Sequence, residues 1–154
     1  MLTFVNANTQ EEYEAAKQLF REYAISINID LGFQHFEEEL DGLKQMYSAP
    51  AGGIILCKED KDFIGCVAIR KIDEEAGELK RMYVKPGNQG KGVGAGLLAQ
   101  AIILAKSCGY KKIRLDTLNY MLPAIHLYKK AGFHEIPAYY FNPNTTAVFF
   151  EMTL

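Results

Sequence analysis

The glycine cluster between residues 87 and 96 constrains the fold of this chain more than any other feature of its sequence. Five of the thirteen glycines lie in this segment, between a strand-like run that ends at Val84 and an apolar helical pattern that begins near Gly94. Glycine tolerates positive φ angles and lets the backbone approach a ligand closely. The amino terminus of a helix adds unpaired N–H donors and a partial positive charge. The segment therefore predicts an anion site, typically for phosphate, with a plain surface loop as the alternative.

Two common nucleotide motifs fit this loop poorly. A P-loop needs a glycine and a Ser or Thr at the positions where this chain has Lys85 and Gly92. The dinucleotide fingerprint fits better, because Gly90, Gly92 and Ala95 match its spacing and Asp116 ends the next predicted strand. However, five residues that include a proline separate the loop from its strand, and the chain is too short for a second nucleotide-binding half. A dinucleotide site therefore remains an alternative for this loop.

The periodicity of the apolar residues predicts a mixed α+β fold. Thr9 and Glu12 form a capping-box pattern before a first amphipathic helix. Runs rich in β-branched and apolar residues predict strands at 2–5, 54–57, 63–72, 78–84, 112–116, 133–136 and 147–154. Further helices are predicted at 36–47, 94–108 and 123–131. We expect a single domain over residues 1–154, in which helices cover both faces of a mixed sheet.

Composition limits the classes of partner and compartment. The chain has 154 residues, 49% hydrophobic and 23% charged, with a formal net charge of −2. This balance gives no general attraction to nucleic acid or to an anionic membrane. No signal peptide or membrane span is expected, and three well-separated cysteines fit a reducing cytoplasm. The three histidines have no metal-ligand spacing, so no metal is expected.

Three segments in order resemble the GNAT family of N-acetyltransferases. The loop Gln89-Gly90-Lys91-Gly92-Val93-Gly94 matches the family pattern Gln/Arg-x-x-Gly-x-Gly/Ala. Residues 78–86 resemble the strand before it, and Asn119 with residues 124–133 resembles the family's second motif. The resemblance implies a splayed sheet, acetyl-CoA as cosubstrate and direct transfer of its acetyl group to an amine.

The resemblance also implies which residues hold acetyl-CoA. The strand of Met82, Tyr83 and Val84 would carry pantetheine through its backbone. Amides of the following loop would cradle the pyrophosphate, and these belong to Gln89, Gly90, Lys91, Gly92, Val93, Gly94 and Ala95. Asn119 and Tyr128 would close over the thiol end.

Two proton transfers accompany attack of an amine on a thioester. The attacking amine must be neutral although a free alkyl amine has a pKa of about 10, and the CoA thiolate leaves from a thiol of pKa about 8.5. Glu78 matches the position of a family general base, with an exposed strand-end carboxylate as the alternative. Tyr128 matches the family's proton donor, with a core tyrosine as the alternative.

The acceptor cannot be identified from the sequence, but three residues are candidates for binding it. Arg70 lies on the strand before Glu78, and its planar guanidinium would suit an acceptor carboxylate. Pairing of Arg70 with an acidic residue at positions 73–75 is the alternative. Tyr139 and Tyr140 would wall the same pocket. The acidic run at 37–41 fits a solvated helix face better than a site that attracts a cationic amine.

The sequence therefore predicts an acetyl-CoA-dependent N-acetyltransferase acting on a small-molecule or peptide amine. A non-catalytic CoA or nucleotide-binding module is the alternative, and a homodimer is left open.

Overall fold

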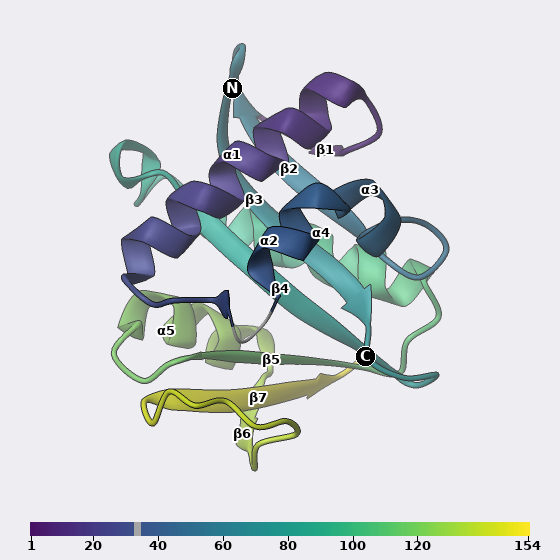
Figure 1. The fold of residues 1–154 in the computed structure, drawn as a ribbon, viewed down its shortest axis with the longest axis vertical. Coiled ribbons are helices and arrows are strands. Elements are labelled where there is room, and N and C mark those ends of the chain that lie inside the picture. The colour runs from purple at the N-terminus through teal and green to yellow at the C-terminus, as the bar shows by residue number, and fades with distance from the viewer. Residues whose placement is uncertain (33–34) are drawn as a thin grey trace.

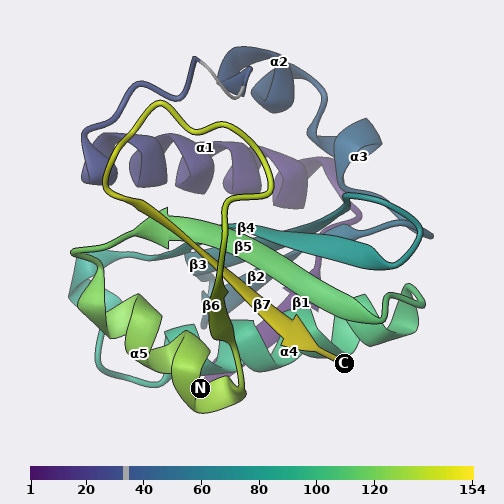
Figure 2. The same cartoon turned by 90° about the horizontal axis from the view of Figure 1, so that it is seen from below.

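The chain folds into a seven-stranded mixed sheet with helices on both faces (Figures 1 and 2). The computed structural model describes residues 1–32 and 35–154. The strands are β1 (Leu2–Asn6), β2 (Gly53–Glu59), β3 (Asp62–Lys71), β4 (Ala76–Val84), β5 (Lys112–Leu118), β6 (His134–Ile136) and β7 (Ala147–Thr153). The helices are α1 (Gln10–Ile27), α2 (Phe36–Asp41), α3 (Leu43–Met46), α4 (Val93–Ser107) and α5 (Leu122–Ala131), with a 3-10 turn η2 (Pro86–Asn88). The strand order β1-β2-β3-β4-β5-β7-β6 confirms the predicted α+β class.

Helix α1 begins where the sequence predicts its cap. Thr9 Oγ1 accepts a hydrogen bond from Glu12 N at 3.2 Å, and Glu12 Oε1 accepts one from Thr9 N at 3.1 Å. This reciprocal capping box satisfies two donors that the helix itself cannot pair. The helix then buries Ala16, Leu19 and Phe20 against the sheet.

The single helix predicted over residues 36–47 is wrong in one respect. The structure has two short helices, α2 and α3, separated by Gly42, whose φ of −129° and ψ of 34° are not helical. Glycine has the weakest helix propensity after proline, so a break costs least at this position. The predicted inward side chains, Phe36, Leu40, Leu43 and Tyr47, are nevertheless buried.

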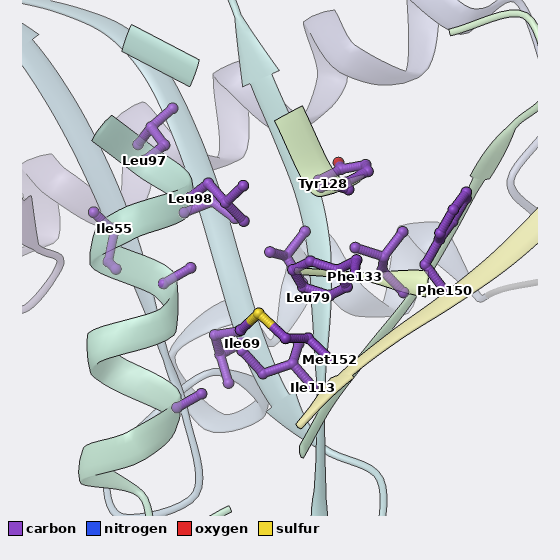
Figure 3. Packing of buried hydrophobic residues seen from close by; sticks show 14 of the residues in the cluster. Ile55, Ile69, Leu79, Leu97, Leu98, Ile113, Tyr128, Phe133, Phe150 and Met152 are labelled. Atoms are coloured by element: carbon purple, nitrogen blue, oxygen red, sulfur yellow. The ribbon is translucent and has the colours of Figure 1, made fainter. Parts of the chain in front are cut away.

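The sheet buries a hydrophobic core on each face. Phe20 and Ile54 belong to the core under α1, α2 and α3. Ile55, Leu97 and Tyr128 belong to the core under α4 and α5, which Figure 3 shows from close by. Successive residues of β2 enter opposite cores because side chains alternate along a strand. On the α1 face, charged residues of β4 and β5 interrupt the core, which is otherwise apolar.

Strands β4 and β5 are parallel neighbours at one end only. Their paired residues are 76–78 of β4 and 112–114 of β5. Beyond these pairs the two strands separate, toward the left of Figure 1. Within the part of the chain that the structure describes, residues 79–84 of β4 have no strand partner on the β5 side. The splayed sheet expected from the family resemblance is confirmed, and it opens beside α5.

Candidate functional site

Two adjoining cavities occupy the gap between β4 and β5. The large cleft has a volume of about 520 Å³ and runs from the end of β4 to the start of α4. The inner pocket has a volume of about 50 Å³ and lies on the α1 side of the gap. Tyr23, Met82, Met121 and Ala124 line both cavities, so a ligand in the cleft can reach the inner pocket past Met82.

The glycine loop forms one end of the large cleft. Gly90 and Gly92 have positive φ angles of 80° and 84°, and a Cβ added at either would meet no heavy atom within 4 Å. Gly92 is the N-cap of α4 and supplies no side-chain acceptor to the first turn of that helix. The amides of Val93, Gly94 and Ala95 therefore remain available to an anion in the cleft. This geometry fits the anion site that the sequence predicts.

Most of the residues predicted to bind the cofactor line the large cleft. They are Met82, Tyr83, Val84, Gln89, Gly90, Gly92, Val93, Gly94 and Ala95. Three others do not line it, and one of them, Tyr128, lines the inner pocket instead. Lys91 is half-exposed, with its Nζ 3.6 Å from Glu59 Oε1. Asn119 is exposed, lines neither cavity, and donates its backbone N–H to Thr146 O at 2.9 Å.

A β-bulge lies in β4 where the strands separate. The register with β3 shifts between Cys66 and Ala68, and Arg81 has a φ of 59°. The bulge directs Arg81 toward α2, where its guanidinium donates two hydrogen bonds of 3.0 and 2.8 Å to the Glu39 carboxylate. Such a bidentate pair has a fixed geometry, so it fixes α2 against the bulge.

Glu39 departs from the sequence-based interpretation of its acidic run. Glu37 and Glu38 are exposed, as a solvated helix face requires, but Glu39 is only 1% exposed. Burial alone would raise the pKa of Glu39, yet the hydrogen bonds and charge of Arg81 outweigh burial, and the pKa lies below its ordinary value. The carboxylate is therefore ionised and held by Arg81, away from any acceptor amine.

Tyr128 packs its ring on Phe133 and Phe150 (Figure 3). It lines the inner pocket together with Met82. Burial raises the pKa of Tyr128 well above its ordinary value, with a further contribution from Asp116. The phenol therefore keeps its proton at neutral pH and is suited to donate a hydrogen bond. Both sequence-based interpretations of Tyr128, core packing and proximity to the thiol, are compatible with this position.

Glu78 is buried rather than exposed at a strand end. It is 3% exposed and lines neither cavity. Its Oε1 accepts a hydrogen bond from Arg70 Nε at 2.9 Å and lies 3.9 Å from Lys80 Nζ. Its Oε2 accepts one from the Tyr139 hydroxyl at 2.6 Å. Arg70 thus pairs with Glu78, and the predicted alternative partners at positions 73–75 are wrong.

Sequence reasoning missed the polar cluster around Asp116. Tyr140 donates a hydrogen bond of 2.5 Å, and Asn142 one of 3.1 Å, to Asp116 Oδ2. Asp116 and Asn142 both line the inner pocket. These partners come from the loop between β6 and β7, which lies on the same side of the sheet as α1 in Figure 2. The usable signal was the alternation along β5, where the core residue Leu115 places Asp116 on the opposite face.

Among residues 1–32 and 35–154, no cluster of three or more His, Cys, Asp or Glu residues has a geometry that could hold a metal ion. No helix among these residues is long and apolar enough to cross a membrane.

Comparisons with known proteins agree with this geometry. The sequence model described as the Acetyltransferase (GNAT) family matches residues 12–133. An uncharacterized N-acetyltransferase of Schizosaccharomyces pombe is 32% identical over 146 residues, which cover 94% of this chain and 90% of that protein. An acetyltransferase from Streptococcus agalactiae has a similar structure, with a TM-score of 0.80 at 19% identity over 99% of this chain and 98% of the other. A GNAT family acetyltransferase from Elizabethkingia anophelis, crystallised with acetyl-CoA bound, has a TM-score of 0.69 at 22% identity over 99% and 98% of the two chains.

Proposed function

The chain belongs to the acetyltransferase (GNAT) family, and from this premise we propose that it transfers the acetyl group of acetyl-CoA to a primary amine by direct attack. The observation that carries the proposal is the divergence of β4 from β5, which leaves residues 79–84 of β4 without a strand partner on the β5 side among the described residues. Residues 82–84 of this edge line the large cleft, and residues 79–82 line the inner pocket. An unpaired strand edge offers N–H and C=O groups to an extended ligand. The pantetheine arm of CoA carries amides that suit such an edge.

The phosphate end of the ligand fits the opposite end of the same cleft. The N-terminal amides of α4 and the loop glycines Gly90 and Gly92 supply donors and space for a pyrophosphate. A dinucleotide would need a second nucleotide-binding half, whereas the other half of this sheet is the short β5-β7-β6 unit. The cleft therefore supports acetyl-CoA over the nucleotide alternative.

The reaction at the junction of the two cavities is an aminolysis. The acceptor nitrogen forms a bond to the thioester carbon, and collapse of the tetrahedral intermediate breaks the C–S bond. The CoA thiolate leaves and takes a proton, for which Tyr128 is the proposed donor. Its place in the inner pocket beside Met82 supports this role. Burial raises the pKa of Tyr128, so the phenol carries its proton at neutral pH.

Glu78 as the general base stays a prediction. Its two carboxylate oxygens accept hydrogen bonds from Arg70 and Tyr139, and it has no surface in either cavity. A proton could reach Glu78 through the Tyr139 hydroxyl if the acceptor lies against Tyr139. The short hydrogen bond between the Tyr139 hydroxyl and Glu78 supports such a relay. Glu78 lines neither cavity, which opposes direct proton transfer from the acceptor to its carboxylate.

The acceptor region lies on the α1 face of the sheet. Arg70 is 38% exposed and uses Nε for Glu78, which leaves its terminal nitrogens for an acceptor carboxylate. Tyr139 and Tyr140 pack against each other and against Phe149. A carboxylate-bearing small molecule or peptide amine stays the proposed acceptor class. A homodimer and a cytoplasmic location likewise stay predictions.

Two measurements test the proposed function. Acetyl-CoA at about 100 times its Kd is expected to stabilise the fold by about 2.7 kcal/mol in thermal unfolding, and NADH is expected to add nothing. A thiol-release assay with Nα-acetyl-lysine and glycylglycine, which carry a carboxylate, and with spermidine and kanamycin, which do not, then tests for transfer. Stabilisation by NADH without stabilisation by acetyl-CoA would reject the proposal. Binding of acetyl-CoA without release on any amine would favour a non-catalytic CoA-binding module.

A further inference from the structure

Two carboxylates face the α1 side of the sheet where β4 and β5 meet, and only one of them reaches a cavity. Glu78 of β4 lines neither cavity, whereas Asp116 of β5 lines the inner pocket. The same pocket is lined by Met82 and Tyr128, the residues placed at the thioester in the proposed function. An acceptor nitrogen that attacks the thioester through this pocket therefore passes Asp116.

The hydrogen bonds of Asp116 hold its carboxylate by one oxygen. Both donors, the Tyr140 hydroxyl and the Asn142 amide, bond to Oδ2. Burial and the charge of Asp116 raise the pKa of Tyr140 far above its ordinary value, so the phenol stays a donor. Over the described residues, Oδ1 accepts no hydrogen bond. The carboxylate is thus oriented by the β6–β7 loop while one oxygen remains for a ligand in the inner pocket.

We propose that Asp116 binds the ammonium group of the acceptor through Oδ1 and accepts a proton from its nitrogen as that nitrogen attacks the thioester. The inference rests on the proposed acetyl transfer. One N–H bond of the ammonium breaks as its proton moves to Asp116, and the electrons of that bond become the lone pair that forms the C–N bond. The C–S electrons then leave with sulfur, and Tyr128 protonates the thiolate. The nitrogen loses its second proton to solvent, solvent returns a proton to the Tyr128 phenolate, and Asp116 returns its proton to solvent when the amide product departs. Tyr140 and Asn142 are positioning residues for the carboxylate.

Several charged and titratable groups face Asp116 from the surrounding elements. They are Tyr23 of α1, Lys80 and Arg81 of β4, Tyr128 of α5, and Tyr139 and Tyr140 of the β6–β7 loop. The tyrosines are neutral below about pH 10, and the charge of Arg81 is matched by Glu39. Lys80 lies 3.9 Å from Glu78 Oε1.

The proposal predicts an unusual pH profile. If Asp116 accepts the proton within the complex, the enzyme uses the ammonium form of the acceptor, and kcat/KM is flat between about pH 6 and pH 8. Without a proton acceptor, only neutral amine reacts, and its fraction rises tenfold for each pH unit below the amine pKa of about 8 to 10. The slope separates proton transfer from general damage, because a structural defect lowers the rate at every pH alike.

The test compares Asp116→Asn with the matched variant Glu78→Gln. The probe is the fastest amine among Nα-acetyl-lysine, glycylglycine, spermidine and kanamycin, at saturating acetyl-CoA. Asp116→Asn is expected to lower kcat/KM for this amine by about 10²–10⁴-fold at neutral pH and to convert the flat profile into one that rises tenfold per pH unit. Glu78→Gln is expected to keep the flat profile, even if its rate falls. A flat profile in Asp116→Asn, or a rising profile in Glu78→Gln alone, would overturn the proposal.

A second pair of variants removes single hydroxyls and keeps both carboxylates. Tyr140→Phe deletes a donor to Asp116, and Tyr139→Phe deletes the donor to Glu78. Tyr140→Phe is expected to lower kcat/KM for the amine more than Tyr139→Phe, with the acetyl-CoA Kd of both within a few-fold of wild type. A larger fall in kcat/KM for Tyr139→Phe than for Tyr140→Phe would contradict the role of Asp116. This comparison holds even if Asp116→Asn fails to fold. If the wild-type protein acetylates none of the amines, both the proposed function and this inference are rejected. If Asp116→Asn keeps the wild-type pH profile of kcat/KM, this inference alone is rejected.

Discussion

Loss of one partner of the ion pair between Glu39 and Arg81 is predicted to destabilise the fold strongly. Glu39 is 1% exposed and Arg81 is 5% exposed, and two hydrogen bonds join them. Glu39→Gln leaves a buried guanidinium without its counter-charge, and loss of one partner of such a pair costs about 3–5 kcal/mol. Domains of this kind have unfolding free energies of about 5–15 kcal/mol. The single substitution is therefore expected to remove a large fraction of the stability.

Urea unfolding at neutral pH measures this loss, with Glu37→Gln as the matched control. Glu37 is two residues away on the same helix but exposed, so its substitution is expected to change the unfolding free energy by less than about 0.5 kcal/mol. The double variant Glu39→Leu with Arg81→Met removes both charges and is expected to recover most of the loss. If the unfolding free energy of Glu39→Gln lies within about 0.5 kcal/mol of the wild-type value, Glu39 does not stabilise the fold through Arg81.

The same pair gives a pH signature whose sign follows from the lowered pKa of Glu39. A carboxyl with a folded-state pKa below its unfolded value stabilises the protein above the unfolded pKa of about 4.3 and loses that contribution as pH falls through the folded pKa. Wild type should therefore lose more stability than Glu39→Gln between about pH 5 and pH 3. Parallel curves for the two proteins would contradict the direction of the shift.

Three other outcomes are expected. Gly92→Ala should raise the acetyl-CoA Kd at least tenfold in calorimetry, because Gly92 has a φ of 84°. Gly87→Ala is the control and should leave the Kd within a few-fold, because its φ is not positive and its Cβ also meets no atom within 4 Å. Tyr128→Phe should lower kcat in the thiol-release assay with little change in acetyl-CoA Kd, and an unchanged kcat would remove Tyr128 from proton donation. Gly96→Ala would bring its Cβ within 2.2 Å of the Phe4 ring and should lower the free energy of unfolding in urea by about 1–3 kcal/mol. Adding Phe4→Leu should restore this stability, and a double variant without recovery would show that the clash with Phe4 is not the cause.

The elements of the fold could be predicted because their signals are local. The capping box of Thr9 and the glycine cluster both act over a few residues, and all seven strands lie where apolar and β-branched runs predict them. The break at Gly42 was missed because one glycine within an amphipathic pattern does not decide between a continuous and a broken helix. Only the packing of α2 and α3 on the sheet decides it.

The cofactor cleft was more predictable than the acceptor region for the same reason. The predicted residues that line the cleft lie within two short stretches, 82–84 and 89–95, whereas the polar groups on the α1 face are paired over long distances in the sequence. Arg81 bonds to a residue 42 positions away, and Tyr139 to one 61 positions away. No local pattern could show that Glu39 and Glu78 are held by these partners. Strand alternation alone pointed to Asp116.

The parallel ladder between β4 and β5 ends after three residues on each strand, and this sets a limit on how the protein can be stabilised. Extending the ladder would add backbone hydrogen bonds and close the gap that holds the large cleft. Any variant that gains stability by this route loses the cleft, so sheet continuity and ligand binding compete for the same backbone groups. A bound pantetheine chain would supply the missing rungs instead, and the protein would reach its most complete hydrogen bonding only as a complex.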